Sequence, residues 1–67
     1  MQVGKFWLIT TSTLKGPWHV ASLDMYWYIV NKDTSEARRI GRVKLRGTNN
    51  FDKARDEAKK LNGENNE

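Results

Sequence analysis

Basic side chains gather in the middle of this 67-residue chain, close behind a run of aromatic residues. Six of its twelve lysines and arginines lie between residues 32 and 46, where only Asp33 and Glu36 oppose them. The run Met-Tyr-Trp-Tyr-Ile-Val at residues 25–30 ends just before this block. Cations beside rings are suited to binding polyanions, nucleic acid first among them. The candidate nucleic-acid-binding residues are therefore one tyrosine and the six bases: Tyr28, Lys32, Arg38, Arg39, Arg42, Lys44 and Arg46.

The positive charge of the chain is concentrated, not spread. The formal net charge is +4 and the pI is about 9.7, on the side typical of nucleic-acid-binding proteins. Residues 32–47 alone carry +4, because six bases there face two acids. Residues 1–31 and 48–62 add one positive charge each, and Glu64 and Glu67 make the C-terminal end acidic. The excess that would attract a polyanion thus lies in the middle of the chain.

Residues that enzymes and metal sites need are scarce. The chain has no cysteine, and its single histidine, His19, cannot build a zinc site alone, since zinc takes three or four ligands. The five glycines form neither a P-loop nor a dinucleotide-binding fingerprint. No serine or aspartate constellation surrounds His19, which we expect at an exposed or edge position. The threonine-rich stretch 10–13 predicts turn chemistry. The sequence predicts a non-enzymatic protein without metal or cofactor.

The length predicts one small α+β domain, residues 1–63, followed by a frayed tail, residues 64–67. A domain of this size buries only about 60% of its unfolded surface, so it depends on the side chains with the largest apolar area. Three Trp, two Tyr and two Phe supply that area, and each ring can bury ~150–250 Å².

Strand signals recur along the first two thirds of the chain. Residues 4–11, rich in β-branched and aromatic types, predict a first strand, and Gly16-Pro17 predicts a turn after it. Residues 18–22 fit either a short strand or a loop that covers the core. Residues 26–31 give the clearest strand, and their unbroken apolar character predicts a central position. The polar residues 32–36 predict a hairpin turn.

Alternation over residues 37–46 predicts which way the bases point. With a period of two, Val43 and Leu45 turn toward the core. The opposite face then carries a row formed by Arg38, Arg42, Lys44 and Arg46. Charges on an edge strand also prevent aggregation, which accounts for one or two of them. Five bases in nine positions exceed that need, because like charges on one face repel unless an anion compensates.

The last segment predicts a helix over residues 50–62. Asn49 is the expected N-cap, Asp52 faces the positive end of the helix dipole, and Asn62-Gly63 ends the helix. An apolar stripe follows helical spacing and should meet Val43, Leu45 and one tryptophan ring; it consists of Phe51, Ala54, Ala58 and Leu61. The predicted fold is an antiparallel sheet of three or four strands with this C-terminal helix packed on one face.

The same alternation separates the aromatic rings. Trp27 must point away from Tyr26 and Tyr28, so we expect Trp27 under the helix and the tyrosines at the surface or edge of the sheet. An exposed tyrosine there can stack on bases or pack against sugars. Phe6 and Trp7 also point oppositely, which predicts one buried and one partly exposed ring.

Residues 26–61 resemble the small N-terminal domains with which phage and transposon tyrosine integrases bind arm-type DNA sites, a fold shared by plant APETALA-type DNA-binding domains. The likeness lies in an aromatic strand (Tyr26-Trp27-Tyr28-Ile29-Val30), a basic strand (Arg38-Arg39-Ile40-Gly41-Arg42-Val43-Lys44) and a helix that runs from Phe51 to Glu57-Ala58. The sheet of that family lies in the major groove of DNA. Carried over, the resemblance implies DNA contacts by Tyr28, Arg38, Arg42, Lys44 and Arg46.

Two departures from that family shape the expectation. A tryptophan-bearing strand precedes the aromatic strand here, and no recombinase domain follows. The resemblance therefore implies a free-standing DNA binder, an accessory or regulatory factor of a phage or mobile element.

Two functions remain open from the sequence. In the first, the hairpin 25–46 lies on duplex DNA with its basic and aromatic face. In the second, the protein is a small phage- or plasmid-type regulator or inhibitor that docks on an acidic surface of a host protein. No secretory signal and no apolar run of transmembrane length occurs, so we expect no membrane partner and a cytoplasmic location, in the host if phage-encoded. An open sheet edge would allow a weak dimer beside the monomer.

Overall fold

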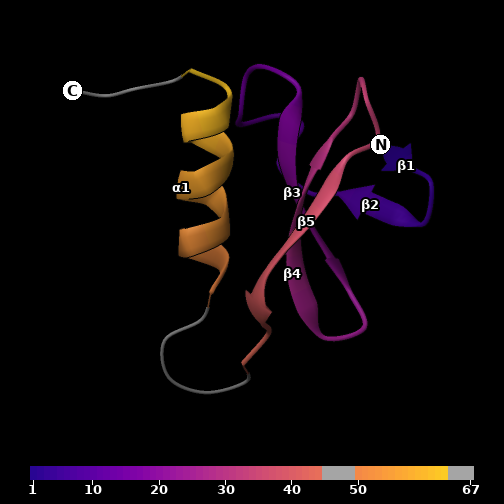
Figure 1. The fold of residues 1–67 in the computed structure, drawn as a ribbon, viewed down its shortest axis with the longest axis vertical. Coiled ribbons are helices and arrows are strands. Elements are labelled where there is room, and N and C mark those ends of the chain that lie inside the picture. Colours follow the sequence, from indigo (N-terminus) through magenta and orange to yellow (C-terminus); the bar gives the residue numbers. More distant parts are fainter. Residues whose placement is uncertain (45–49, 64–67) are drawn as a thin grey trace.

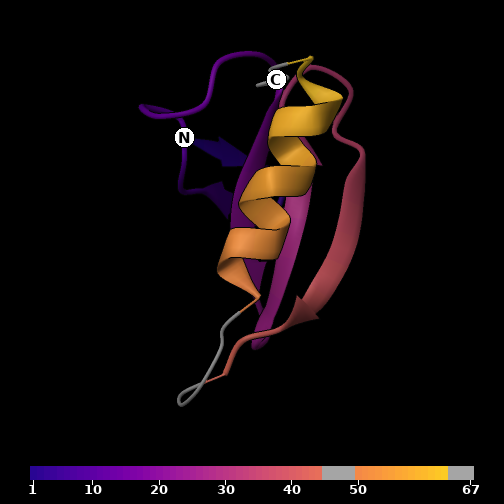
Figure 2. The same ribbon diagram turned by 90° about the vertical axis from the view of Figure 1, so that its left-hand side faces the viewer.

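Five antiparallel strands and one helix make up the fold, which a computed structural model describes for residues 1–44 and 50–63. The strands are β1 (Gln2–Val3), β2 (Phe6–Leu8), β3 (Trp18–Leu23), β4 (Tyr26–Asn31) and β5 (Ala37–Arg42), and they lie in this order in one sheet. The helix α1 (Phe51–Leu61) packs on one face of the sheet (Figures 1 and 2). The α+β prediction is confirmed, with five strands instead of three or four.

The strand expected over residues 4–11 is a short hairpin instead. Val3 pairs with Phe6, and the turn between them begins at Gly4, whose φ is 58°. Positive φ at the first position of a two-residue turn is the requirement of a type II′ hairpin, which glycine meets without steric cost. The segment left open, residues 18–22, is a strand, because β3 pairs with β4 from Trp18 to Leu23.

The bounds and the central position predicted for β4 are confirmed. It pairs with β3 on one side and with β5 on the other. The turn after it is organised by Asn31, whose side-chain oxygen accepts hydrogen bonds from the N–H groups of Asp33 (2.8 Å) and Thr34 (3.0 Å). Such an Asx turn mimics a backbone turn, which is why asparagine is favoured there.

A β-bulge interrupts the pairing of β4 with β5. Trp27 pairs with Gly41, but the next residue, Tyr28, pairs with Arg39, so Ile40 is one residue too many on β5. The strand ends at Arg42, four residues before the predicted end. Because a bulge adds one residue to one strand, it breaks the period-two alternation on which the sequence prediction relied.

The core under α1 is built on two alanines. Ala54 and Ala58 are fully buried, and their small side chains let the helix approach Val20 and Ile29 of the sheet. The ring of Trp27 meets Phe51 edge-on, with 5.2 Å between centroids, so the prediction that Trp27 lies under the helix is confirmed. Val43 is half-buried, whereas Leu45 lies outside the described residues.

The fourth residue of the predicted stripe, Leu61, is 37% exposed, so its predicted burial is wrong. It lies only about 20° around the helix from the buried Ala54, given 3.6 residues per turn, but it is the last helical residue. It therefore lies at the margin of the contact with the sheet. In residues 1–44 and 50–63, no helix is long and apolar enough to cross a membrane.

Each end of α1 is fastened to the sheet by an asparagine. The side chain of Asn62 accepts a hydrogen bond from the Trp18 N–H (2.8 Å) and donates one to the Trp18 carbonyl (3.0 Å). At the other end Asn50, which precedes the first helical residue, donates to the Arg42 carbonyl (3.0 Å). Gly63, with φ of 78°, ends the helix as predicted. The N-cap is Asn50, so the prediction of Asn49, which itself lies outside the described residues, is wrong by one position.

A glycine lies opposite each asparagine. A Cβ atom on Gly16 would come within 2.8 Å of the Asn62 side chain, and one on Gly41 within 2.5 Å of the Asn50 side chain. Real Cβ atoms do not approach other atoms so closely, so both positions require glycine for the helix ends to dock as they do.

A second apolar cluster lies on the sheet face away from α1. Leu8, Ala21 and Val30 are buried there. His19 is also buried, at 2% exposure, so its predicted exposed or edge position is wrong. Its Nδ1 lies 3.2 Å from the Thr10 carbonyl, and the Thr10 hydroxyl accepts the Val20 N–H at 3.0 Å. The predicted turn chemistry of the threonine stretch is confirmed, because Thr10 also accepts the N–H groups that close the turn after it.

Candidate functional site

The two faces of the sheet differ in what covers them. On the helix face, Trp18, Val20 and Ile29 pack toward α1. The opposite face, here called the distal face, carries the cluster around Ala21 and Val30. The hairpin of β1 and β2 lies on that side, away from α1 (Figure 1). The rest of the distal face is on β4 and β5, which β3 separates from this hairpin in the strand order.

The bulge at Ile40 decides which arginines reach the distal face. Paired residues of neighbouring antiparallel strands point to the same side of a sheet. Arg39 pairs with Tyr28 and Arg42 pairs with Tyr26, so both arginines lie on the distal face. Arg38 pairs with Ile29 and lies on the helix face. The prediction that Arg38 and Arg42 share one face is therefore wrong, because the extra residue shifts the alternation between them.

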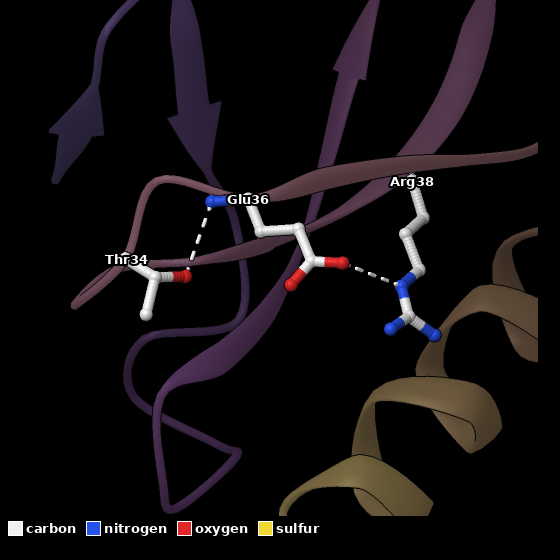
Figure 3. Close-up of polar contacts among 3 residues, drawn as sticks. All are labelled: Thr34, Glu36 and Arg38. Atoms are coloured by element: carbon white, nitrogen blue, oxygen red, sulfur yellow. Dashed lines mark hydrogen bonds and ion pairs between the residues drawn. The ribbon is translucent and has the colours of Figure 1, made fainter.

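Arg38 is engaged within the fold. Its guanidinium lies over the Trp18 ring, 5.2 Å from the centroid, and its Nε donates to Glu36 Oε2 at 3.1 Å (Figure 3). The Glu36 N–H in turn donates to the Thr34 hydroxyl at 3.2 Å. An arginine whose charge is matched by a neighbouring carboxylate contributes little net field, so Arg38 is poorly suited to attract an anion.

Three cations and three rings come together on the distal face, and we call this set the basic–aromatic patch: Lys5, Phe6, Tyr26, Tyr28, Arg39 and Arg42. The guanidinium of Arg39 lies over the Tyr26 ring at 4.8 Å, and the Tyr28 and Phe6 rings are 5.0 Å apart. The Lys5 ammonium is 6.0 Å from the Phe6 centroid. The rings are half-buried and the cations are exposed.

Among the described residues, the ion pairs give the cations of the patch no acidic partner. Between described residues, the ion pairs join Arg38 to Glu36 and Arg55 to Asp52 and Asp56, and none of them includes Lys5, Arg39 or Arg42. A guanidinium presents donors in a planar fork that matches two oxygens of a phosphate. Rings beneath it fix its plane. Cations placed above aromatic rings in this way are suited to binding phosphate groups.

The remaining predicted residues lie elsewhere. Lys32 is exposed in the turn at the opposite end of β4 from Tyr26. Lys44 is exposed two residues after β5 ends, and Arg46 lies outside the described residues. The fold thus brings three predicted residues, Tyr28, Arg39 and Arg42, into the patch.

Lys5, Phe6 and Tyr26 belong to the patch but were not among the candidates. Tyr26 lies two residues before Tyr28 on the same strand, so alternation already placed the two side chains on one face. Lys5 and Phe6 depend on the hairpin that Gly4 opens, for which the glycine just ahead of the apolar run 6–9 was the available signal.

Among the described residues, no metal-binding arrangement competes with the patch. In the part of the chain that the structure describes, no three His, Asp or Glu side chains are close enough to hold an ion. The exposed cations and half-buried rings of the patch are suited to binding an anion reversibly. Comparison of the chain with protein-family models, with curated proteins and with solved structures gives no match.

Proposed function

We propose that this protein is a non-enzymatic DNA-binding protein that lays the basic–aromatic patch on duplex DNA. The observation that carries the proposal is the pair Arg39 and Arg42, aligned on one exposed face by the bulge and unmatched by any ion pair between described residues. Neutralising phosphates releases the counterions that surround DNA, which drives sequence-independent binding.

The rings support the same proposal. Tyr26 is flanked by Arg39, which stacks on it, and by its pairing partner Arg42. Aromatic side chains in such positions pack against sugars or exposed base edges while neighbouring cations hold the phosphates. The half-buried state of Tyr26 and Tyr28 keeps them rigid, so little side-chain entropy is lost on binding.

The resemblance to the arm-binding domains of tyrosine integrases adds to this support. In those domains the outward side chains of the sheet meet bases and phosphates, and the patch here lies on the sheet face away from α1. On that resemblance we extend the proposal to an accessory or regulatory role in a phage or mobile element. The contacts it implies change, however: Arg39 replaces Arg38, because Arg38 pairs with Ile29 on the helix face.

A charge-reversal experiment tests the proposal. Arg39→Glu combined with Arg42→Glu removes four units of charge from the distal face. Lys53→Glu combined with Lys60→Glu removes the same four units from exposed positions on α1. Binding to a random duplex is measured by fluorescence polarisation at low salt. We expect the first variant to lose binding and the control to keep most of the wild-type affinity.

Both variants should unfold at nearly the wild-type temperature, since exposed charges contribute about 0–1 kcal/mol to stability. Equal losses in both would mean that net charge alone attracts DNA. Wild-type affinity in the Arg39/Arg42 variant would refute the proposal.

One exposed ring favours a second function, docking on another protein. Trp7 is 61% exposed and Ile9 is 45% exposed. Trp7 pairs with Ser22 and so lies on the helix face, on the strand next to β3. Tryptophan is enriched among the residues that dominate protein interfaces. If the protein acts in this way, Trp7→Ala releases a protein retained from nuclease-treated extract and leaves DNA binding unchanged.

A further inference from the structure

In the turn between β3 and β4, an apolar residue adopts a backbone conformation that residues with side chains disfavour. Leu23 pairs with Tyr26, and the two residues between them, Asp24 and Met25, have φ of 52° and 70°. Two positive φ values define a type I′ turn, whose usual sequence is Asn-Gly or Asp-Gly. Met25 stands where glycine would be free of strain, and it is 51% exposed. Neither burial nor turn geometry accounts for a methionine there.

This turn is fixed beside the basic–aromatic patch. The Met25 carbonyl accepts a hydrogen bond from the Val43 N–H at 2.7 Å. Val43 lies between Arg42 and Lys44, both exposed, and Tyr26 directly follows Met25. The turn and the end of β5 lie at the same end of the sheet (Figure 1). A flexible apolar side chain is thus held rigidly at its backbone with cations on the neighbouring segment.

We propose that Met25 is a wedge that inserts between neighbouring base pairs and kinks the bound duplex. The inference rests on the proposed function and deepens it by naming the substrate as deformable duplex DNA. Apolar side chains, methionine among them, can insert at a base step, partly unstack it and bend DNA by roughly 20–90°. Arg42, on the segment that the Met25 carbonyl fastens, would hold a phosphate beside the opened step.

The proposal predicts a sequence preference without base-edge contacts. Pyrimidine–purine steps such as TA unstack most easily, whereas A-tracts are stiff. Wild-type protein should therefore bind a duplex with a central TA step several-fold more tightly than an A-tract duplex of equal length. Removing the wedge should abolish this difference while phosphate contacts keep the general affinity.

Energy transfer between dyes at the two ends of a short duplex measures the bend, and polarisation measures binding in the same sample. We expect wild type to shorten the end-to-end distance of the TA duplex. Met25→Gly should bind with an affinity within about threefold of wild type but should not shorten that distance, because wedge insertion and phosphate contact are separate. Met25→Leu, which keeps an apolar wedge, should still bend the duplex. Ile9→Ser, which removes a different exposed apolar side chain, should bend it as wild type does.

Misfolding cannot imitate the expected result. Glycine relieves the left-handed strain, so the thermal midpoint of Met25→Gly should rise by a few degrees. Binding without bending by wild type, or equal bending by wild type and Met25→Gly, would overturn the wedge and leave the proposed function standing. Failure of wild type to bind either duplex at low salt would overturn the proposed function, and the wedge with it.

Discussion

Replacing Asn62 by alanine should destabilise this protein more than its partial exposure suggests. Asn62 makes two hydrogen bonds to the backbone of Trp18, a residue that is 7% exposed. Each such bond contributes about 0.5–1.5 kcal/mol, and a buried donor left without a partner costs about 1–3 kcal/mol. The Trp18 N–H is such a donor. The expected loss is therefore about 2–4 kcal/mol, and a core of this size rarely supplies more than about 3–5 kcal/mol in total.

Asn50→Ala is the matched control for this prediction. Asn50 also fastens a helix end, but it makes one exposed hydrogen bond, to a carbonyl that water can satisfy instead. Its loss should cost less than about 1 kcal/mol. Urea denaturation followed by circular dichroism gives both values, provided that the m-values stay equal. If Asn62→Ala lowers the free energy of unfolding no more than Asn50→Ala does, the two hydrogen bonds to Trp18 do not stabilise the helix as described.

Two further pairs of substitutions test the packing of α1 by thermal unfolding. Leu61→Ala should lower the free energy of unfolding by about 1 kcal/mol, because 37% of Leu61 is already exposed. Ile29→Ala, at a residue that is 0% exposed, should lower it by about 2–5 kcal/mol. Equal losses would place Leu61 in the core. Gly16→Ala should be clearly worse than Gly4→Ala, although both have positive φ, because only the Cβ on Gly16 collides with Asn62. Equal destabilisation by the two alanines would show that strain alone, about 1–2 kcal/mol, accounts for both.

Local sequence signals predicted the elements whose conformation is decided locally. β4 was found with its bounds because aromatic and β-branched residues run unbroken from Tyr26 to Val30. The helix was found because Phe51, Ala54 and Ala58 keep helical spacing. The position of Trp27 under the helix followed from alternation within one uninterrupted strand.

The wrong predictions concern features that depend on one inserted residue or on contacts between residues far apart in the sequence. One extra residue at Ile40 reversed the face of Arg38, although Gly41 inside a strand pattern was a usable sign of a bulge. The burial of His19 depends on Thr10, nine residues away, and on the second apolar cluster. Periodicity within one strand carries no information about such contacts. The fastening of both helix ends by asparagines opposite glycines was likewise invisible, because the partners are 44 residues apart for Asn62 and Trp18.

The salt dependence of DNA binding by two neighbouring arginine variants tests the central claim most directly. If Lys5, Arg39 and Arg42 each neutralise one phosphate, the logarithm of the wild-type binding constant should fall against the logarithm of salt with a slope near −2.7, about 0.9 per contact. Arg39→Ala should reduce the magnitude of this slope by about 0.9. Arg38→Ala should leave the slope unchanged, because Arg38 lies on the other face and is paired with Glu36. A flat wild-type response, or equal slopes for the two variants, would contradict the assignment of DNA binding to the distal face.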